Sequence, residues 1–130
     1  MTMKSWHTMI VSFDPDIFYK LIPELSIYAK KRRIRRIILC PSSAVNETVE
    51  SPFEWVNPTG FHALFDHTAK RAVQDPAQLV LVFRKRFELL HVPFWMIAQS
   101  EIHHCSPSHI RKSLYKADAI YRQSEQRLGR

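Results

Sequence analysis

Glycine occupies only 2 of the 130 positions in this chain, Gly60 and Gly129. Tight β-hairpin turns need residues with positive φ, and glycine adopts them at the least steric cost. The scarcity of glycine therefore argues against a hairpin-rich sandwich or barrel. It also excludes the phosphate-binding loops GxGxxG and GxxxxGK[ST], because neither can be assembled from these two positions.

Length and composition predict a single domain spanning residues 1–130, because 130 residues build one ordinary core. The apolar fraction of 45% and the charged fraction of 24% are typical of a folded soluble protein. No apolar run approaches the roughly 20 residues that cross a bilayer, and the N-terminus lacks an apolar signal core. Two cysteines do not make a secreted disulfide framework. We therefore expect a cytoplasmic protein with no membrane partner.

Four dipeptides predict helix starts, because each joins a capping residue to proline. Asp, Asn and Ser side chains accept hydrogen bonds from free N–H groups at a helix start, and proline suits the first helical position. The four dipeptides are Asp14-Pro15, Asn57-Pro58, Asp75-Pro76 and Ser106-Pro107.

Helical spacing of apolar residues follows three of these starts. After Asn57-Pro58 the apolar residues are Phe61, Leu64, Phe65, Ala72 and Val73. After Asp75-Pro76 they are Leu79, Val82, Phe83, Phe87 and Leu90, with Gln78 at the capping-box position. After Ser106-Pro107 they are Ile110, Leu114, Ala117 and Tyr121.

Three short apolar segments predict strands, at residues 8–13, 34–40 and 92–98. Residues 14–33 stay open, because Pro23 interrupts a helical pattern and residues 24–28 fit either a helix or a strand. Residues 41–56 read as a polar loop. The expected fold is α/β, or α+β, helix-rich with a small central sheet and a helix-strand-helix C-terminal half.

The charge balance predicts a polyanionic partner. Nineteen Lys and Arg against twelve Asp and Glu leave a formal net charge of +7. A domain this basic attracts polyanions, which excludes acidic DNA mimics as a class. The ten cations that we expect to bind nucleic acid are Lys30, Lys31, Arg32, Arg33, Arg35, Arg36, Arg84, Arg86, Arg111 and Lys112.

The densest part of this set is residues 30–36, where six of seven residues are cations. If the segment is extended, Arg33 and Arg35 point to one side and Ile34 to the other. Such a row would follow a phosphate backbone and release counterions. We expect backbone contact rather than base readout, since few Asn or Gln residues accompany the cations. A solvated turn or a localisation signal would have the same composition.

The sequence also contains candidate metal-ligand and acid–base residues. His103, His104, Cys105 and His109 are zinc-ligand types at short spacing, but a closed site needs four ligands and Cys40 would have to join from elsewhere in the fold. Whether these residues form a zinc site stays open. His62 and Asp66, four apart, form either an acid–base pair or an ordinary surface pair. We predict no catalytic residue, no metal and no cofactor.

One longer pattern points to a family. Residues 84–102 followed by Ile110-Arg-Lys-Ser-Leu114 resemble the tail of restriction-endonuclease-like domains, most closely the endonuclease subunits of heteromeric transposases (TnsA-like). Phe13-Asp-Pro-Asp-Ile17 is similar to an early segment of that family, so the resemblance spans about residues 11–115. His91 stands where the family usually has glycine.

This resemblance implies a DNA partner in the biology of a mobile element, plasmid or phage. The family cuts DNA with an upstream Glu, then Asp, then Glu-x-Lys or Gln-x-Lys around a divalent metal. The sequence contains no such ExK or QxK motif between the basic run and residue 84. The resemblance therefore implies a relative without catalytic activity.

The sequence predicts a small basic accessory protein that binds nucleic acid, DNA more than RNA, through its phosphates. A protein partner in a larger complex is the second candidate partner. One alternative is a metal-dependent nuclease that uses Asp66 and Glu54 with His62 or Lys70. Another is a protein-interaction module in which apolar aromatic residues within 52–65 form a docking patch.

Overall fold

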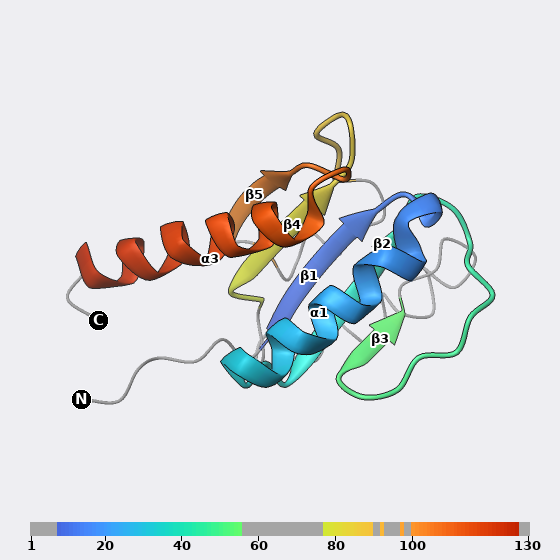
Figure 1. Ribbon diagram of the computed structural model, residues 1–130, viewed down its shortest axis with the longest axis horizontal. Coiled ribbons are helices and arrows are strands. Elements are labelled where there is room, and N and C mark those ends of the chain that lie inside the picture. The colour runs from blue at the N-terminus through green and yellow to red at the C-terminus, as the bar shows by residue number, and fades with distance from the viewer. Residues whose placement is uncertain (1–7, 56–76, 90–91, 93–96, 98–99, 128–130) are drawn as a thin grey trace.

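The computed structural model describes residues 8–55, 77–89, 92, 97 and 100–127, and its centre is a five-stranded parallel sheet (Figure 1). The strand order is β3-β2-β1-β4-β5, and every neighbouring pair is parallel. The strands are β1 (Thr8–Phe13), β2 (Arg36–Pro41), β3 (Phe53–Trp55), β4 (Leu79–Phe83) and β5 (Glu101–Cys105). The predicted α/β class is confirmed.

Two helices pack on one face of this sheet (Figure 1). The first, α1 (Phe18–Arg32), follows a 3-10 turn over Pro15–Ile17, and α3 (Ile110–Arg127) follows β5. Helical structure thus begins at Pro15, as the Asp14-Pro15 dipeptide predicts. The stripe predicted for the last helix is also confirmed, because Ile110, Leu114, Ala117 and Tyr121 are all buried.

The central strands are buried on both faces, which explains their nearly continuous apolar sequences. Met9, Val11 and Phe13 of β1 face the two helices, together with alternate residues of β2 and β4. Ile10 and Val80 belong to a second cluster on the opposite face. Strand period 2 divides each strand between the two clusters.

The segment 14–33, which the sequence left open, is helical from Pro15 to Arg32. The helix α1 continues through Pro23, which is exposed and lies in its second turn. It ends at Arg33, which adopts a left-handed conformation with φ 56°. The N–H groups of Arg33 and Ile34 both donate to the carbonyl of Ala29. The basic run is therefore not one extended segment, since residues 30–32 form the last turn of a helix.

The helix predicted after Asp75-Pro76 is wrong, because Leu79–Phe83 forms strand β4 between β1 and β5. Five consecutive apolar residues fit a helix face and a strand buried on both faces equally well. Pairing with β1 and β5 makes this segment a strand. Residues 84–86 form a bend rather than the continuation of a helix.

Two further strands were not predicted. The segment Glu101–Cys105, where the family resemblance implies a turn, is strand β5, and residues 53–55 of the expected loop form β3. The helix predicted after Pro58 lies outside the described residues. So does most of the strand predicted at 92–98, of which only Val92 and Ile97 are described.

Candidate nucleic-acid interface

Arg36, the last cation of the basic run, forms an ion pair between two strands. It is only 9% exposed, and its Nε and Nη2 atoms lie 2.6 and 2.9 Å from the two carboxylate oxygens of Glu54. This bidentate pair joins β2 to β3. A bidentate guanidinium–carboxylate pair is among the strongest side-chain contacts, so Arg36 serves the fold.

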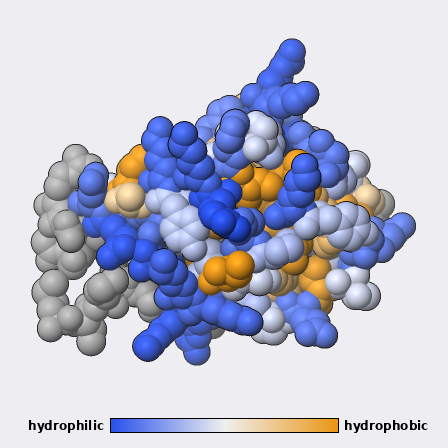
Figure 2. Space-filling view, viewed as in Figure 1, coloured by the Kyte–Doolittle hydropathy of each residue, from blue (hydrophilic) through white to orange (hydrophobic). Residues whose placement is uncertain are grey.

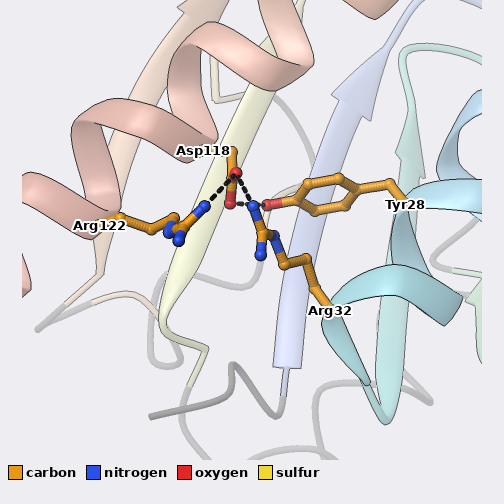
Figure 3. Close-up of polar contacts among 4 residues, drawn as sticks. All are labelled: Tyr28, Arg32, Asp118 and Arg122. Atoms are coloured by element: carbon orange, nitrogen blue, oxygen red, sulfur yellow. Dashed lines mark hydrogen bonds and ion pairs between the residues drawn. The ribbon is translucent and has the colours of Figure 1, made fainter. Parts of the chain in front are cut away.

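Arg32 is committed to a second buried pair, with Asp118 of α3 (Figure 3). Its Nη2 lies 2.5 Å from one carboxylate oxygen of Asp118, and the hydroxyl of Tyr28 donates to the other at 2.8 Å. Arg122 approaches the same carboxylate at 3.9 Å. Asp118 is 3% exposed, so this cluster binds α1 to α3 inside the protein.

The other four cations of the run, Lys30, Lys31, Arg33 and Arg35, are exposed. Within the described part of the chain, no carboxylate lies within ion-pair distance of Lys30, Arg33 or Arg35. The ammonium of Lys31 lies 5.1 Å from the centre of the Tyr115 ring, a cation–π contact. The structure therefore divides the run into two structural arginines and four available cations.

A groove of about 880 Å³ runs along α1, and three of these cations line it. Lys30, Arg33 and Arg35 lie at the C-terminal end of the helix. At its N-terminal end, the hydroxyl of exposed Tyr19 donates to the carboxylate of Glu47. The groove between them has apolar walls that include Phe18, Ile22, Pro52 and Phe53.

The remaining predicted cations are spread over other elements. Arg84 follows β4 and is buried in ion pairs with Asp14 and Glu88. Arg111 of α3 donates to Glu24 of α1 at 2.8 and 3.1 Å, and Lys112 and Arg86 are exposed. The face that carries α1 and α3 is covered largely by hydrophilic side chains (Figure 2).

The predicted zinc-ligand types do not converge. Cys105 packs with the helices on one face of the sheet, whereas Cys40 belongs to the cluster on the opposite face. Both thiols are free and buried, and burial raises the pKa of Cys105 to about 12. His104 donates from Nε2 to the carbonyl of Arg84 at 2.6 Å. In the described part of the chain, no three His, Cys, Asp or Glu side chains are close enough to hold a metal ion.

Little of the two alternative sites is described. Glu54, a candidate for the nuclease, is held by Arg36, while Asp66, His62 and Lys70 lie outside the described residues. Of the docking patch, Phe53 and Trp55 pack against the core, and the Trp55 ring stacks on Phe18 with centroids 5.5 Å apart. The described aromatic residues of that segment therefore contribute to the core.

Sequence reasoning missed a second hollow, at the carboxyl ends of β1, β4 and β5. Lys20, Lys85 and Ser108 line it, together with Arg84 and Asp16. In the sequence, the dipeptides Asp14-Pro15 and Ser106-Pro107 indicate only helix starts. Both also directly follow strands, and parallel pairing brings such strand ends to one edge of a sheet.

None of the described helices has the length and apolar character needed to span a bilayer. Comparison with family models, with curated proteins and with solved structures finds no match to this chain. The resemblance to transposase endonuclease subunits therefore stays a prediction, and the residues and their geometry carry the functional argument.

Proposed function

We propose that this protein binds nucleic acid through its phosphates, with the cations at the C-terminal end of α1 as the main contact. The observation that carries this proposal is the group of exposed cations Lys30, Lys31, Arg33 and Arg35, in a protein of net charge +7. Cations on exposed side chains neutralise phosphates and release counterions, which drives association.

The neighbouring arginines support this surface indirectly. Arg32 and Arg36 are held by Asp118 and Glu54, so they fix the end of α1 and the start of β2 on either side of Arg33 and Arg35. The phosphate-contacting set is therefore smaller than the sequence predicted. DNA is the preferred polymer in this proposal, on the family resemblance. We expect backbone contact rather than base readout, because few Asn or Gln residues accompany the cations.

The test measures binding of labelled duplex DNA, single-stranded DNA and RNA by fluorescence anisotropy across a salt series. Arg33 and Arg35 are replaced together by Ala. For duplex DNA each lost phosphate contact lowers the slope of log K against log salt by about 0.9, so we expect a reduction of about 1.8 in the double variant. Arg32 and Arg36 are left intact, because their removal would disturb the fold.

The control is Lys116→Glu on the exposed side of α3, which has the same net charge as the double variant, since +7 − 2 = +5 in both cases. It should keep a slope near that of the wild type. Equal slopes in both variants would show that overall charge alone governs binding and would overturn the proposed surface. Cleavage that depends on Mg²⁺ in parallel samples would favour the nuclease alternative.

A further inference from the structure

The second hollow lies where the direction of strand connection changes. From β1 the chain continues to β2 on one side, and β4 and β5 lie on the other side. In open parallel sheets, ligands bind outside the carboxyl ends of the strands at such a switch point. Here the hollow has a volume of about 670 Å³ and is bounded by the ends of β4 and β5 and the start of α1.

Arg84 lines this hollow with a buried guanidinium that has one unsatisfied hydrogen-bond donor. The residue is 8% exposed, and its Nε and Nη2 atoms pair with Asp14 at 3.3 Å and Glu88 at 3.0 Å. Its Nη1 is buried without a hydrogen-bond partner. A buried donor without a partner is destabilising, so this guanidinium keeps one hydrogen-bond donor unused.

The carboxylates that hold Arg84 are partly exposed to solvent. The side chains of Asp14 and Glu88 are 42% and 49% exposed, so each can regain water when it releases the guanidinium. Arg84 itself has no such access, because it is buried. An anion bound by Arg84 would therefore compete with carboxylates that are partly exposed to solvent.

Further donors surround the same hollow. Lys20 of α1 and Lys85 after β4 are exposed and line it, and Asp16 is the acidic residue among its lining side chains. The hydroxyls of Ser106 and Ser108, 3.1 Å apart, lie in the loop that leads into α3.

We propose that this hollow binds a phosphate monoester, held by Arg84, Lys20 and Lys85 with the hydroxyls of Ser106 and Ser108. A monoester carries nearly two charges and three terminal oxygens, which match several converging donors better than one backbone diester. The group is the phosphate of a mononucleotide or the 5′-phosphate end of a nucleic-acid strand. The inference is independent of the surface at Arg33 and Arg35, at the other end of α1.

The test follows thermal unfolding of the full chain with increasing inorganic phosphate, at ionic strength held constant with chloride. A ligand that binds only the folded state raises the unfolding temperature with the logarithm of its concentration. Arg84→Ala would remove a buried side chain and disturb the packing around it, so the test variant is Lys20→Ala with Lys85→Ala. Loss of charge-assisted hydrogen bonds should weaken binding by about tenfold or more.

Two further variants decide the interpretation. Lys116→Glu matches the net charge of the double variant, since +7 − 2 = +5 for each, and should bind phosphate like the wild type. Glu88→Gln removes a competitor for Arg84 and should bind phosphate more tightly. Equal weakening in Lys116→Glu and the double variant, or no saturable binding in the wild type, would overturn the proposal.

The affinities of three further ligands distinguish the two sources of the phosphate. Tighter binding of AMP than of inorganic phosphate, with no binding of adenosine, identifies a nucleotide. Tighter binding of a 5′-phosphorylated oligonucleotide than of its 5′-hydroxyl form identifies a strand end. A 5′-hydroxyl oligonucleotide that binds as well as the phosphorylated form would count against the monoester, while leaving the proposed phosphate-backbone surface intact.

Discussion

Asp118 stabilises the contact between the two helices through a buried carboxylate with three polar neighbours. Replacing it with Ala leaves the hydroxyl of Tyr28 and the guanidinium of Arg32 without their shared acceptor. Breaking a buried ion pair in this way costs about 3 kcal/mol. We therefore expect Asp118→Ala to lower the free energy of unfolding in urea by about that amount.

The matched control is the exposed pair between the same two helices, Glu24 and Arg111. Because an exposed pair gains little in water, Arg111→Ala should change stability by less than about 0.5 kcal/mol. If both variants lost the same amount, the buried position of Asp118 would have no special role.

Tyr28 makes the free energy of unfolding depend on pH in the alkaline range. Burial, followed by the hydrogen bond to Asp118, raises the pKa of Tyr28 well above its ordinary value of 10.0. Above pH 10 the unfolded chain therefore loses this proton while the folded protein keeps it, so stability falls as the pH rises. Urea unfolding of the wild type between pH 9 and pH 11 should show this decline.

Tyr28→Phe removes the titrating group, so its stability should decline less steeply above pH 10 than that of the wild type. At pH 7 the variant should be less stable by about 1.5 kcal/mol, the worth of a hydrogen bond to a charged acceptor. Parallel curves for the two proteins above pH 10 would assign the decline to other groups.

Some arginines of the basic run can contact a ligand and others cannot, and the difference depends on partners that are distant in the sequence. Arg32 meets Asp118 across 86 positions, and Arg36 meets Glu54 across 18. The sequence shows a run of six equivalent cations, because residue type and spacing carry no record of such partners. The hollow at Arg84 escaped prediction for the same reason, since Asp14 lies on a different strand end.

At the scale of elements, α1 ends on a residue with an unfavourable conformation. Arg33 has φ 56° at a position where helices usually place glycine. A residue with a Cβ atom costs about 1 kcal/mol there, so Arg33→Gly should raise the free energy of unfolding by that amount. The same change removes an exposed cation, so the salt slope for duplex DNA should fall by about 0.9.

Arg33→Ala separates the two effects of this change. It removes the same charge but keeps the Cβ atom, so it should bind DNA like Arg33→Gly without the gain in stability. A variant Arg33→Gly that is more stable and binds DNA as well as the wild type would show that Arg33 contacts no phosphate.

Pro23 is the second unusual feature of α1. Proline has no N–H, so the carbonyl of Tyr19 loses its helical partner. Pro23→Ala should restore this hydrogen bond and stabilise the protein by roughly 1 to 3 kcal/mol in urea unfolding. The control is Pro15→Ala at the helical start, where a missing N–H has no cost and no gain is expected. Equal changes in both variants would contradict this account.

Elements with a distinctive pattern could be predicted from the sequence. Residues 8–13 form β1 with the predicted bounds, and the apolar stripe of α3 is buried as predicted. The segment Leu79–Phe83 failed because a fully apolar run has no period of its own. Strand β5, with the sequence Glu-Ile-His-His-Cys, failed because it lies at the sheet edge and is only partly buried.

At the scale of the whole molecule, the two proposed phosphate contacts lie at opposite ends of α1. Lys20 and Arg33 are 13 positions apart, which corresponds to about 20 Å along a helix. At the duplex rise of about 3.4 Å per nucleotide, a strand needs about six nucleotides to cover that distance. A 5′-phosphorylated dinucleotide bound in the hollow at Arg84 is therefore too short to reach Arg33 and Arg35 as well, whereas a strand of twelve nucleotides can contact both.

This geometry predicts that the effect of each double variant depends on ligand length. Lys20→Ala with Lys85→Ala should weaken binding of the phosphorylated dinucleotide and of the twelve-nucleotide strand. Arg33→Ala with Arg35→Ala should weaken only the longer strand, because its second contact is intramolecular and adds avidity of about a hundredfold. Titrations of both ligands by calorimetry measure these effects. If the Arg33 and Arg35 changes weakened the dinucleotide as much as the long strand, the two groups of cations would act as one site.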